Sequence, residues 1–383
     1  MADAPSLEVS DSLADVPVTE WNALSCGHPL LSHAFLHGLH ESGCATEETG
    51  WAPRFILLRR DGRLRGALPL YAKSHSYGEY VFDWAWAEAW HRAGADYYPK
   101  LLSAVPFTPV SGPRLLAEAG EDRALLIRAA LQFASESGVS TFHCLFPTET
   151  EAEELRAAGL MLRRTVQFHW ENSGFGSFED FLATMNHEKR KKVKQERRRV
   201  RDEGVVFERR TGREIAESDW AFFFRCYEDT YRRHHSSPYL TLDFFLRIAE
   251  SMPEHLMMAI GTRDGRPVCA AFDIFDGNAL YGRYWGTTAY VPGLHFEACY
   301  YQAIEFCIER RIGRFEGGAQ GEHKLARGLL PVTTYSAHWV ADSRFDRAVR
   351  QFVERESRGV AAYVNELEEH GPFKSPQTLD PRP

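Results

Sequence analysis

The stretch Arg60-Asp61-Gly62-Arg63 recurs as Arg263-Asp264-Gly265-Arg266 in the second half of the chain. Each copy follows an apolar run, Phe55-Ile56-Leu57-Leu58 before the first and Leu256-Met257-Met258-Ala259-Ile260 before the second. Asp-Gly between two apolar runs is a strong signal for a β-hairpin. The two stretches therefore predict two hairpins, one in each half of the chain.

Other elements repeat in the same order around the two hairpins. A helix over 122–137 and a strand over 139–145 are predicted after the first, and a helix over 294–311 and a strand over 313–316 after the second. One shared tetrapeptide is a weak signal, but the matching order of helix, hairpin, strand, helix and strand predicts two copies of one unit. We therefore expect the α+β fold class, with two tandem domains that each contain a mixed, mostly antiparallel sheet flanked by helices.

The boundary between the two domains is predicted near 171–177, where Gly, Asn and Ser cluster between a strand and a helix. This position gives an N-terminal domain over 1–170 and a C-terminal domain over 171–372. The polar, proline-rich tail over 373–383 is expected to be disordered.

Composition points to a globular protein with large cores. Of the 383 residues, 44% are hydrophobic, yet no apolar run approaches the roughly 20 residues that span a bilayer. The first residues lack the charged-then-apolar order of a signal peptide. The seven cysteines include no C-x-x-C pair, and no Cys/His cluster, P-loop or H-E-x-x-H motif is present. We expect a cytoplasmic protein without a metal, with peripheral contact at the inner membrane as an open alternative.

Positive charge is concentrated in one segment of an acidic chain. The formal net charge is −8, yet nine of the thirteen residues over 189–201 are Lys or Arg. Such a patch, which includes Lys191 and Lys192, could meet the phosphates of a coenzyme, a tRNA or an anionic lipid surface. It could equally be the solvated face of a helix whose Val193 and Val200 pack inward.

The segment Phe315–Gly328 combines four glycines with acidic, basic and imidazole side chains, which is typical of a catalytic loop. His323 titrates near neutral pH and is the first candidate for the base, with Glu322 and Glu316 as alternatives or as orienting groups. The binding candidates in this loop are Gly317, Gly318, Gln320, Lys324 and Arg327. The alternative interpretation is a polar turn with helix-capping glycines.

Two further places supply candidates. Alternation along the strand 280–285 places Tyr281, Arg283 and Trp285 on one face, and Tyr284 on the other. Tyr284 could protonate a leaving group, or it could be a packed core tyrosine, and Arg283 is a binding candidate. His295 lies at the predicted start of the helix over 294–311, where free N–H groups favour anions.

Four stretches of the chain resemble a known family. They are GEYVFDWAWAEAW (78–90), YYPKLLSAVPFTPVSGPRLL (97–116), NHEKRKKVKQERRRV (186–200) and HFEACYYQAIEFCIERRIGRFEGGAQGEHKLARGLLP (295–331). Between residues 51 and 338 the chain resembles the FemAB-like "peptidoglycan biosynthesis/recognition" family, within the wider GNAT acyltransferase group. The resemblance implies two tandem GNAT-like domains, with the catalytic site in the second. The coenzyme-phosphate turn Q/R-x-x-G-x-G/A of ordinary GNAT proteins is not matched before residue 294.

The resemblance implies amide formation by acyl transfer, which needs a base, donors for the oxyanion and an acid for the leaving group. The first hypothesis is an N-acyltransferase that uses acyl-CoA as a co-substrate, without a bound cofactor, and acts on an amine. Some bacterial ceramide synthases resemble this group, so a long-chain sphingoid base is one expected acceptor. The alternatives are an aminoacyl-tRNA-dependent ligase that acts on peptidoglycan precursors, with tRNA as its partner, and a non-catalytic module that recognises cell wall or lipid.

Overall fold

The computed structural model describes residues 4–318, 321–369 and 371–374. The first half contains β1 (Ser6–Ser10), α1 (Val18–Leu24), α2 (His33–Glu41), β2 (Trp51–Pro53), β3 (Phe55–Arg60), β4 (Arg63–Leu68), β5 (Tyr71–Lys73), α3 (Trp84–Arg92), β6 (Lys100–Ser103), β7 (Leu116–Ala117), α4 (Gly120–Glu136), β8 (Thr141–Leu145), α5 (Glu149–Ala157) and β9 (Met161–Glu171). The second half contains α6 (Phe178–Thr184), α7 (His187–Asp202), β10 (Val205–Thr211), α8 (Glu217–Arg233), α9 (Leu242–Ser251), β11 (Leu256–Arg263), β12 (Arg266–Phe275), β13 (Ala279–Thr287), α10 (Leu294–Phe296), α11 (Gln302–Arg310), β14 (Arg314–Glu316), β15 (Leu330–Val340) and α12 (Ser343–Glu369).

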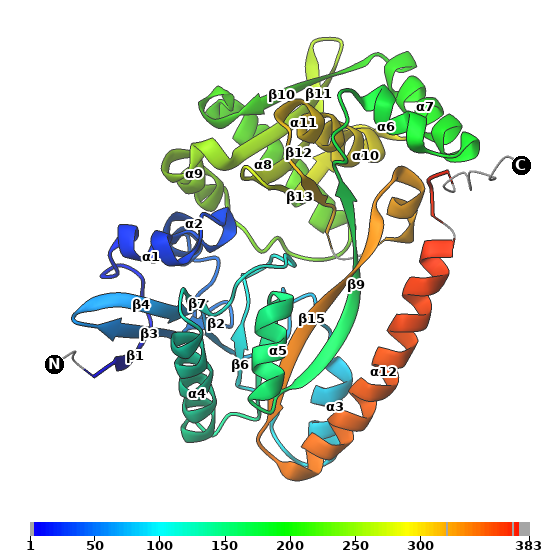
Figure 1. The fold of residues 1–383 in the computed structure, drawn as a ribbon. Coiled ribbons are helices and arrows are strands. Elements are labelled where there is room, and N and C mark those ends of the chain that lie inside the picture. The colour runs from blue at the N-terminus through cyan, green and yellow to red at the C-terminus, as the bar shows by residue number, and fades with distance from the viewer. Residues whose placement is uncertain (1–3, 319–320, 370, 375–383) are drawn as a thin grey trace, which may run out of the picture.

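One mixed sheet runs through both halves of the molecule. Its eleven strands follow the order β10-β11-β12-β13-β14-β9-β15-β8-β6-β5-β2, and β1-β3-β4-β7 form a smaller sheet. The long strands β9 and β15 lie side by side across the middle of the molecule, and α12 runs along them (Figure 1). β15 also pairs with β8, so a strand from the C-terminal segment extends the sheet of the N-terminal half.

Both predicted hairpins are confirmed. β3 pairs antiparallel with β4, and β11 with β12. Asp61 and Gly62 have φ of 50° and 74°, and Asp264 and Gly265 have φ of 52° and 72°. Positive φ at both central residues defines the two-residue turn whose twist matches that of the flanking strands, and Asp-Gly adopts it at low cost.

The internal repeat extends beyond the hairpins to a parallel pair of strands. β6 pairs parallel with β8, and the connection between them contains α4. β13 pairs parallel with β14, and the connection contains α10 and α11. The expected α+β fold class is confirmed, because helices flank mixed and mostly antiparallel strands in both halves.

The predicted helix over 294–311 is present, and it contains a distortion. A π-helical turn, Glu297–Tyr301, joins α10 to α11, and Arg311 ends the helix with φ of 58°. The helix packs on the sheet through buried side chains such as Ala298 and Ile304. A π turn inserts one extra residue and is often found at functional sites.

The sheet does not break at the predicted boundary. β9 ends at Glu171, and Ser177 caps α6 by accepting a hydrogen bond from the Asp180 amide. Within the predicted tail, Phe373 forms an isolated bridge with Met185, and residues 375–383 lie outside the described residues. The two halves, 1–170 and 171–372, therefore contribute strands to one continuous sheet.

Gly286 on β13 allows α8 to lie directly on the sheet. A Cβ atom at this position would lie 2.2 Å from the Cys226 carbonyl oxygen, which is a backbone atom that cannot move away. We expect Gly286→Ala to lower the free energy of unfolding by about 1–3 kcal/mol, as for other overpacked sites. Urea unfolding with Gly277→Ala as the control tests this, since a Cβ at Gly277 would meet nothing within 4 Å. Equal stability of the two variants would contradict the close approach of α8 to β13 at Gly286.

Candidate active site

A cavity opens where the parallel strands β13 and β14 separate. The pair is in register for three residues only, from Ala279 opposite Arg314 to Tyr281 opposite Glu316. Beyond that point lies a cavity of about 190 Å³, which we call the wedge. Its lining residues are Tyr80, Pro109, Ala271, Asp273, Gly282, Arg283, Tyr284, Trp285, His295, Cys299, Tyr300, Phe315, Gly317 and Gly318. The wedge thus combines both halves of the chain, with Tyr80 and Pro109 from the first.

A β-bulge in β13 shapes one wall of the wedge. Tyr284 lies opposite Phe272, and Gly282 lies opposite Asp273, so Arg283 is an extra residue without a partner on β12. The predicted alternation of this strand is therefore wrong. Tyr281 and Tyr284 pack on one side of the sheet, and Trp285 packs on the other. A bulge re-aims side chains in this way, and single-sequence alternation cannot reveal it.

Asp273, which the sequence analysis missed, carries the only carboxyl group that lines the wedge among the described residues. Its side chain is 2% exposed, and its Oδ2 atom has no hydrogen-bond partner in the described part of the chain. Burial raises the pKa of Asp273 to about 8, against the opposing effect of a hydrogen bond from the Arg283 amide. The available signal was one carboxylate in the otherwise apolar run from Val268 to Phe275.

A second cavity of about 240 Å³ adjoins the wedge at the start of α10. Trp285 and His295 line both cavities, and Arg233 contributes a cation to the second. The His295 ring lies over Trp285, with 4.6 Å between ring centroids. Burial lowers the pKa of His295 to about 4, so the ring is neutral at physiological pH. His295 therefore lies at the junction of the two cavities.

The loop after β14 reaches the wedge through Tyr300. His323 is exposed, and its Nε2 atom lies 3.1 Å from the Tyr300 hydroxyl. Partial burial, followed by the charge of Arg327, lowers the pKa of His323. Lys324 is buried and donates to the Gly318 carbonyl at 2.8 Å, and burial lowers its pKa to about 8. Lys324 thus holds the glycine backbone that forms one edge of the wedge.

The remaining acidic candidates lie away from the wedge. Glu316 is buried on the opposite side of β14 from Phe315, where Arg314 Nη2 lies 3.0 Å from its Oε1. Burial raises the pKa of Glu316 to about 7. Glu322 is exposed and accepts a hydrogen bond from Tyr363 of α12 at 2.6 Å. Gln320 lies outside the described residues.

Tyr284 lines the wedge, although its hydroxyl proton is already engaged. The hydroxyl donates to the Phe107 carbonyl at 3.1 Å and accepts from Arg283 Nη2 at 3.0 Å. Burial raises the pKa of Tyr284. Tyr284 is therefore placed to position Arg283 rather than to release a proton.

A buried ion pair connects the loop to the basic helix α7. Arg327 is 2% exposed, and its Nη2 atom donates to Glu196 Oε1 at 2.6 Å. Tyr301 donates to the other oxygen of Glu196. The Arg327 side chain also lies over the ring of Phe296, next to His295. Arg327 is thus fixed as a structural cation within this network.

Removal of the Tyr301 hydroxyl should weaken this network. Tyr301→Phe leaves Glu196 Oε2 without its donor, so we expect the free energy of unfolding to fall by about 1–3 kcal/mol. Tyr363→Phe, which removes the hydroxyl of the exposed pair with Glu322, should change stability by less than about 0.5 kcal/mol. Chemical denaturation of both variants is the measurement. A larger loss for Tyr363→Phe would mean that the network is assigned incorrectly.

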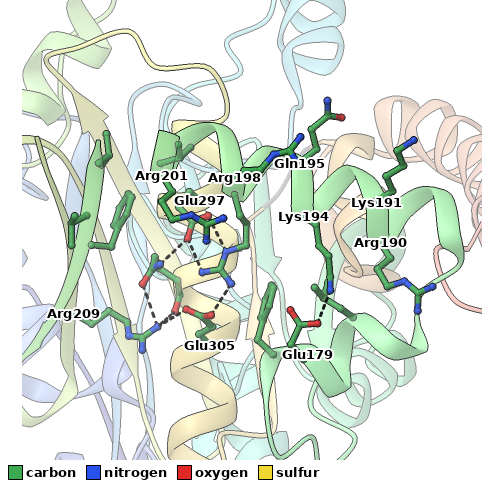
Figure 2. A pocket seen from close by; sticks show the side chains of 18 of the residues that line it. Glu179, Arg190, Lys191, Lys194, Gln195, Arg198, Arg201, Arg209, Glu297 and Glu305 are labelled. Carbon is green, nitrogen blue, oxygen red and sulfur yellow. Dashed lines mark hydrogen bonds and ion pairs between the residues drawn. The ribbon is translucent and has the colours of Figure 1, made fainter. Parts of the chain in front are cut away.

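The Lys- and Arg-rich segment forms α7 and lines a separate groove of about 1040 Å³ (Figure 2). Val193 and Val200 are buried, as the alternative interpretation of this segment expected. At the floor, Arg197 pairs with Glu297 at 3.0 Å. Within the described chain, the side chains of four cations of the groove form no ion pair or hydrogen bond: Arg190, Lys191, Arg198 and Arg201.

The groove and the wedge lie on different faces of one helix. Glu297, Gln302 and Glu305 line the groove, whereas His295 and Tyr300 line the wedge. Lys191 lines the groove. Lys192 is exposed on α7, and its charge contributes to the lowered pKa of His323. The structure therefore separates the sequence-predicted residues into two groups.

The fold combines one mixed sheet that runs through both halves with a cavity between two diverging parallel strands. The model of the FemAB-like family, described as "peptidoglycan biosynthesis/recognition", matches residues 12–375. The chain belongs to this family. A comparison with curated proteins gave no match.

Solved structures show the same fold at low sequence identity. FemX is 12% identical with a TM-score of 0.55, and the match covers 88% of this chain and 98% of FemX. L-PGS from Bacillus licheniformis is 12% identical with a TM-score of 0.52, over 83% of this chain and 94% of that one. A conserved protein of unknown function from Bacteroides thetaiotaomicron is 12% identical with a TM-score of 0.51, and the match covers 88% of this chain and 100% of that one. None of the described helices is long and apolar enough to cross a lipid bilayer.

Proposed function

We propose that the chain is an acyltransferase that forms an amide in the wedge, with Asp273 as the base. The observation that carries this proposal is the placement of Asp273. Asp273 lines a cavity between diverging strands, and its Oδ2 atom has no hydrogen-bond partner in the described part of the chain. The pKa of Asp273 is raised to about 8. A carboxylate near neutral pKa can accept a proton from an attacking amine, which is the task of a general base.

The rest of the wedge supplies the other requirements of acyl transfer. Asp273 takes a proton from the amine, and the amine nitrogen bonds to the carbonyl carbon of the donor. The resulting oxyanion can accept from main-chain amides on the side of β13 that faces β14, where the pairing with β14 ends at Tyr281. The carbon–sulfur bond of a thioester then breaks. The leaving thiolate takes a proton from the Tyr300 hydroxyl. The hydroxyl regains a proton from His323 Nε2, 3.1 Å away, while His323 Nδ1 takes one up from solvent, which also receives the proton held by Asp273.

We propose an acyl thioester, acyl-CoA in the first instance, as the donor and an amine as the acceptor. The cavity at the start of α10 adjoins the wedge and can hold the donor's tail, with Arg233 and free helix amides for its phosphates. The acceptor then enters past Tyr80 and Pro109. A long-chain sphingoid base remains the acceptor to test first, with its amine in the wedge and its chain outside.

The groove beside α7 favours a second candidate, an aminoacyl-tRNA-dependent ligase that acts on peptidoglycan precursors. Four unpaired cations along one helix face can contact a phosphate backbone, and each released counterion makes binding salt-dependent. In this case the leaving group is a ribose hydroxyl instead of a thiolate. The wedge residues would keep the same roles.

The test is a mass-spectrometric search for amide product with the full-length protein. Acyl-CoA donors of several chain lengths are combined with a panel of amines that includes sphinganine, and free thiol is measured in parallel. Amide and thiol in equal amounts support the first candidate. Tight tRNA binding that weakens steeply with salt, together with product only from aminoacyl-tRNA, supports the second. If the folded protein binds a cell-wall or lipid fragment but yields no product with either donor, the result would favour the third alternative, a non-catalytic recognition module.

A further inference from the structure

The unexplained feature of the wedge is Arg283, a cation without a carboxylate partner. Its Nη2 atom donates to the Phe107 carbonyl at 2.5 Å, to Thr108 Oγ1 at 2.9 Å and to the Tyr284 hydroxyl at 3.0 Å. All three acceptors are neutral. Across residues 4–318, 321–369 and 371–374, no carboxylate forms an ion pair with Arg283, and its Nε and Nη1 atoms make no hydrogen bond.

The surroundings of Arg283 favour an anionic partner for its guanidinium group. The guanidinium is half-buried and lies 4.8 Å from the ring centre of Tyr284. A charge in such a setting is expensive unless it is paired. Burial raises the pKa of Asp273 to about 8, against the opposing charge of Arg283, so the protonated acid is the commoner form at neutral pH. The rigid N–H fork of arginine matches a carboxylate or phosphate with two parallel hydrogen bonds.

Tyr80 provides a second polar group at the same place. It comes from the N-terminal half, lines the wedge and has φ of 62°, which is uncommon for a tyrosine. Such strain costs on the order of 1–3 kcal/mol and persists only where the surroundings impose it. The hydroxyl of Tyr80 forms no hydrogen bond with any described residue. Its backbone follows Glu79, which a buried ion pair with Lys100 at 2.7 Å holds in place.

We propose that Arg283 and Tyr80 form a subsite for an anionic group, so that the acceptor is an amine with a carboxylate or phosphate close to its nitrogen. The inference rests on the proposed function, because it places the amine beside Asp273. The wedge has a volume of about 190 Å³, so both groups must belong to a compact head of one molecule. Among long-chain amines, the proposed subsite favours those with a phosphate on the head group over the unmodified sphingoid base.

The test measures binding of small probes to the full-length protein by ligand-observed NMR, without any acyl donor. The probes are phosphoethanolamine, glycine and ethanolamine. The two anionic amines should bind at least about tenfold more tightly than ethanolamine, as expected for charge-assisted hydrogen bonds. The stronger of the two anionic probes identifies the anion as phosphate or carboxylate.

Two variants assign the effect to the subsite. Arg283→Met should abolish the preference for anionic probes, and Tyr80→Phe, which removes one hydroxyl and leaves the fold intact, should reduce it severalfold. Arg65→Met, at an exposed position on β4, is the control and should bind as the wild type does. Equal affinity for ethanolamine and the anionic probes, or an unchanged preference in both variants, would overturn the proposal.

The outcome is separable from that of the proposed function. Asp273→Asn should keep the anion preference, since it leaves Arg283 and Tyr80 in place. An anion preference without any amide product would support the subsite and contradict the proposed acyltransferase activity. Amide formation on amines that carry no anionic group, without an anion preference, would contradict the subsite and leave the proposed acyltransferase activity supported.

Discussion

Asp273→Asn is expected to reduce amide formation by about 10²–10⁴-fold, the usual contribution of a general base. The side-chain amide of the introduced Asn has the shape of the protonated Asp273 that dominates below pH 8. It cannot accept a proton from the attacking amine. Asp273 is 2% exposed, so solvent cannot take over its role from the same position. The measurement is kcat/KM for amide formation, compared between the wild type and the variant under identical conditions. A variant with wild-type activity would remove Asp273 from the mechanism.

The pH dependence of the same reaction provides a second readout. Because Asp273 must be ionised to act, kcat/KM of the wild type should rise through pH about 8, and this rise should be absent in Asp273→Asn. Stability should move in the opposite direction. The pKa of Asp273 is raised in the folded state, so its contribution to stability is full below pH 3.8 and declines as the pH rises through 8. The variant should therefore gain stability relative to the wild type as the pH increases. A constant difference in stability would contradict the raised pKa.

Lys100→Met should produce the largest loss of stability, about 3–5 kcal/mol at pH 7. Lys100 is 0% exposed, and its Nζ atom donates to Glu79 at 2.7 Å, to Asp83 and to Ser76 at 2.8 Å. Removal of the ammonium leaves Asp83 as a buried negative charge whose pKa of about 2 was held low mainly by Lys100. Tyr80 should also move, because it lies between the two clamped acids. Guanidinium unfolding and anionic-probe binding are the measurements.

The loss in Lys100→Met should depend on pH in a defined direction. Since the lowered pKa of Asp83 stabilises the folded protein above pH 3.8, the deficit should be full at pH 7 and should shrink as the pH falls toward 2. Lys194→Met is the matched control, because its ion pair with Glu179 is exposed and such pairs contribute at most about 1 kcal/mol. A deficit for Lys100→Met no larger than that of the control would refute the buried clamp.

Local signals in the sequence predicted the local structure of this protein. The two Asp-Gly turns have positive φ at both residues, as the flanking apolar runs required. The helix after β13 begins at Leu294, as predicted from its apolar period. These features depend on neighbours in sequence, which a single chain displays directly. The π turn Glu297–Tyr301 was not predicted, because one inserted residue leaves almost the same apolar pattern.

Long-range pairing was beyond the reach of the sequence. Nothing in the composition of β15 indicates that it pairs with both β8 and β9 and so joins the two halves in one sheet. The bulge at Arg283 depends on the register between β12 and β13. For the same reason, the loop Phe315–Gly328 directed attention to Glu322 and His323, whereas the carboxyl group in the cavity belongs to Asp273. Its burial, not its neighbours in sequence, gives it a pKa near 8.

The basic segment illustrates a pattern that was interpreted correctly in part. Val193 and Val200 pack inward as expected, and part of the charge is neutralised by Glu297 and Glu305 from the facing helix. The sequence could not show that these acids lie opposite α7. The cations that remain unpaired define the groove, and they lie on a different face of the helix from the wedge.

The most direct test of the wedge as the substrate site is photo-crosslinking with a diazirine derivative of phosphoethanolamine, followed by peptide mapping of the full-length protein. We predict labels on residues 282–285 of β13 or on Tyr80, with loss of the label when unmodified phosphoethanolamine competes. Labels confined to residues 190–201 of α7, or an unchanged pattern under competition, would contradict the account.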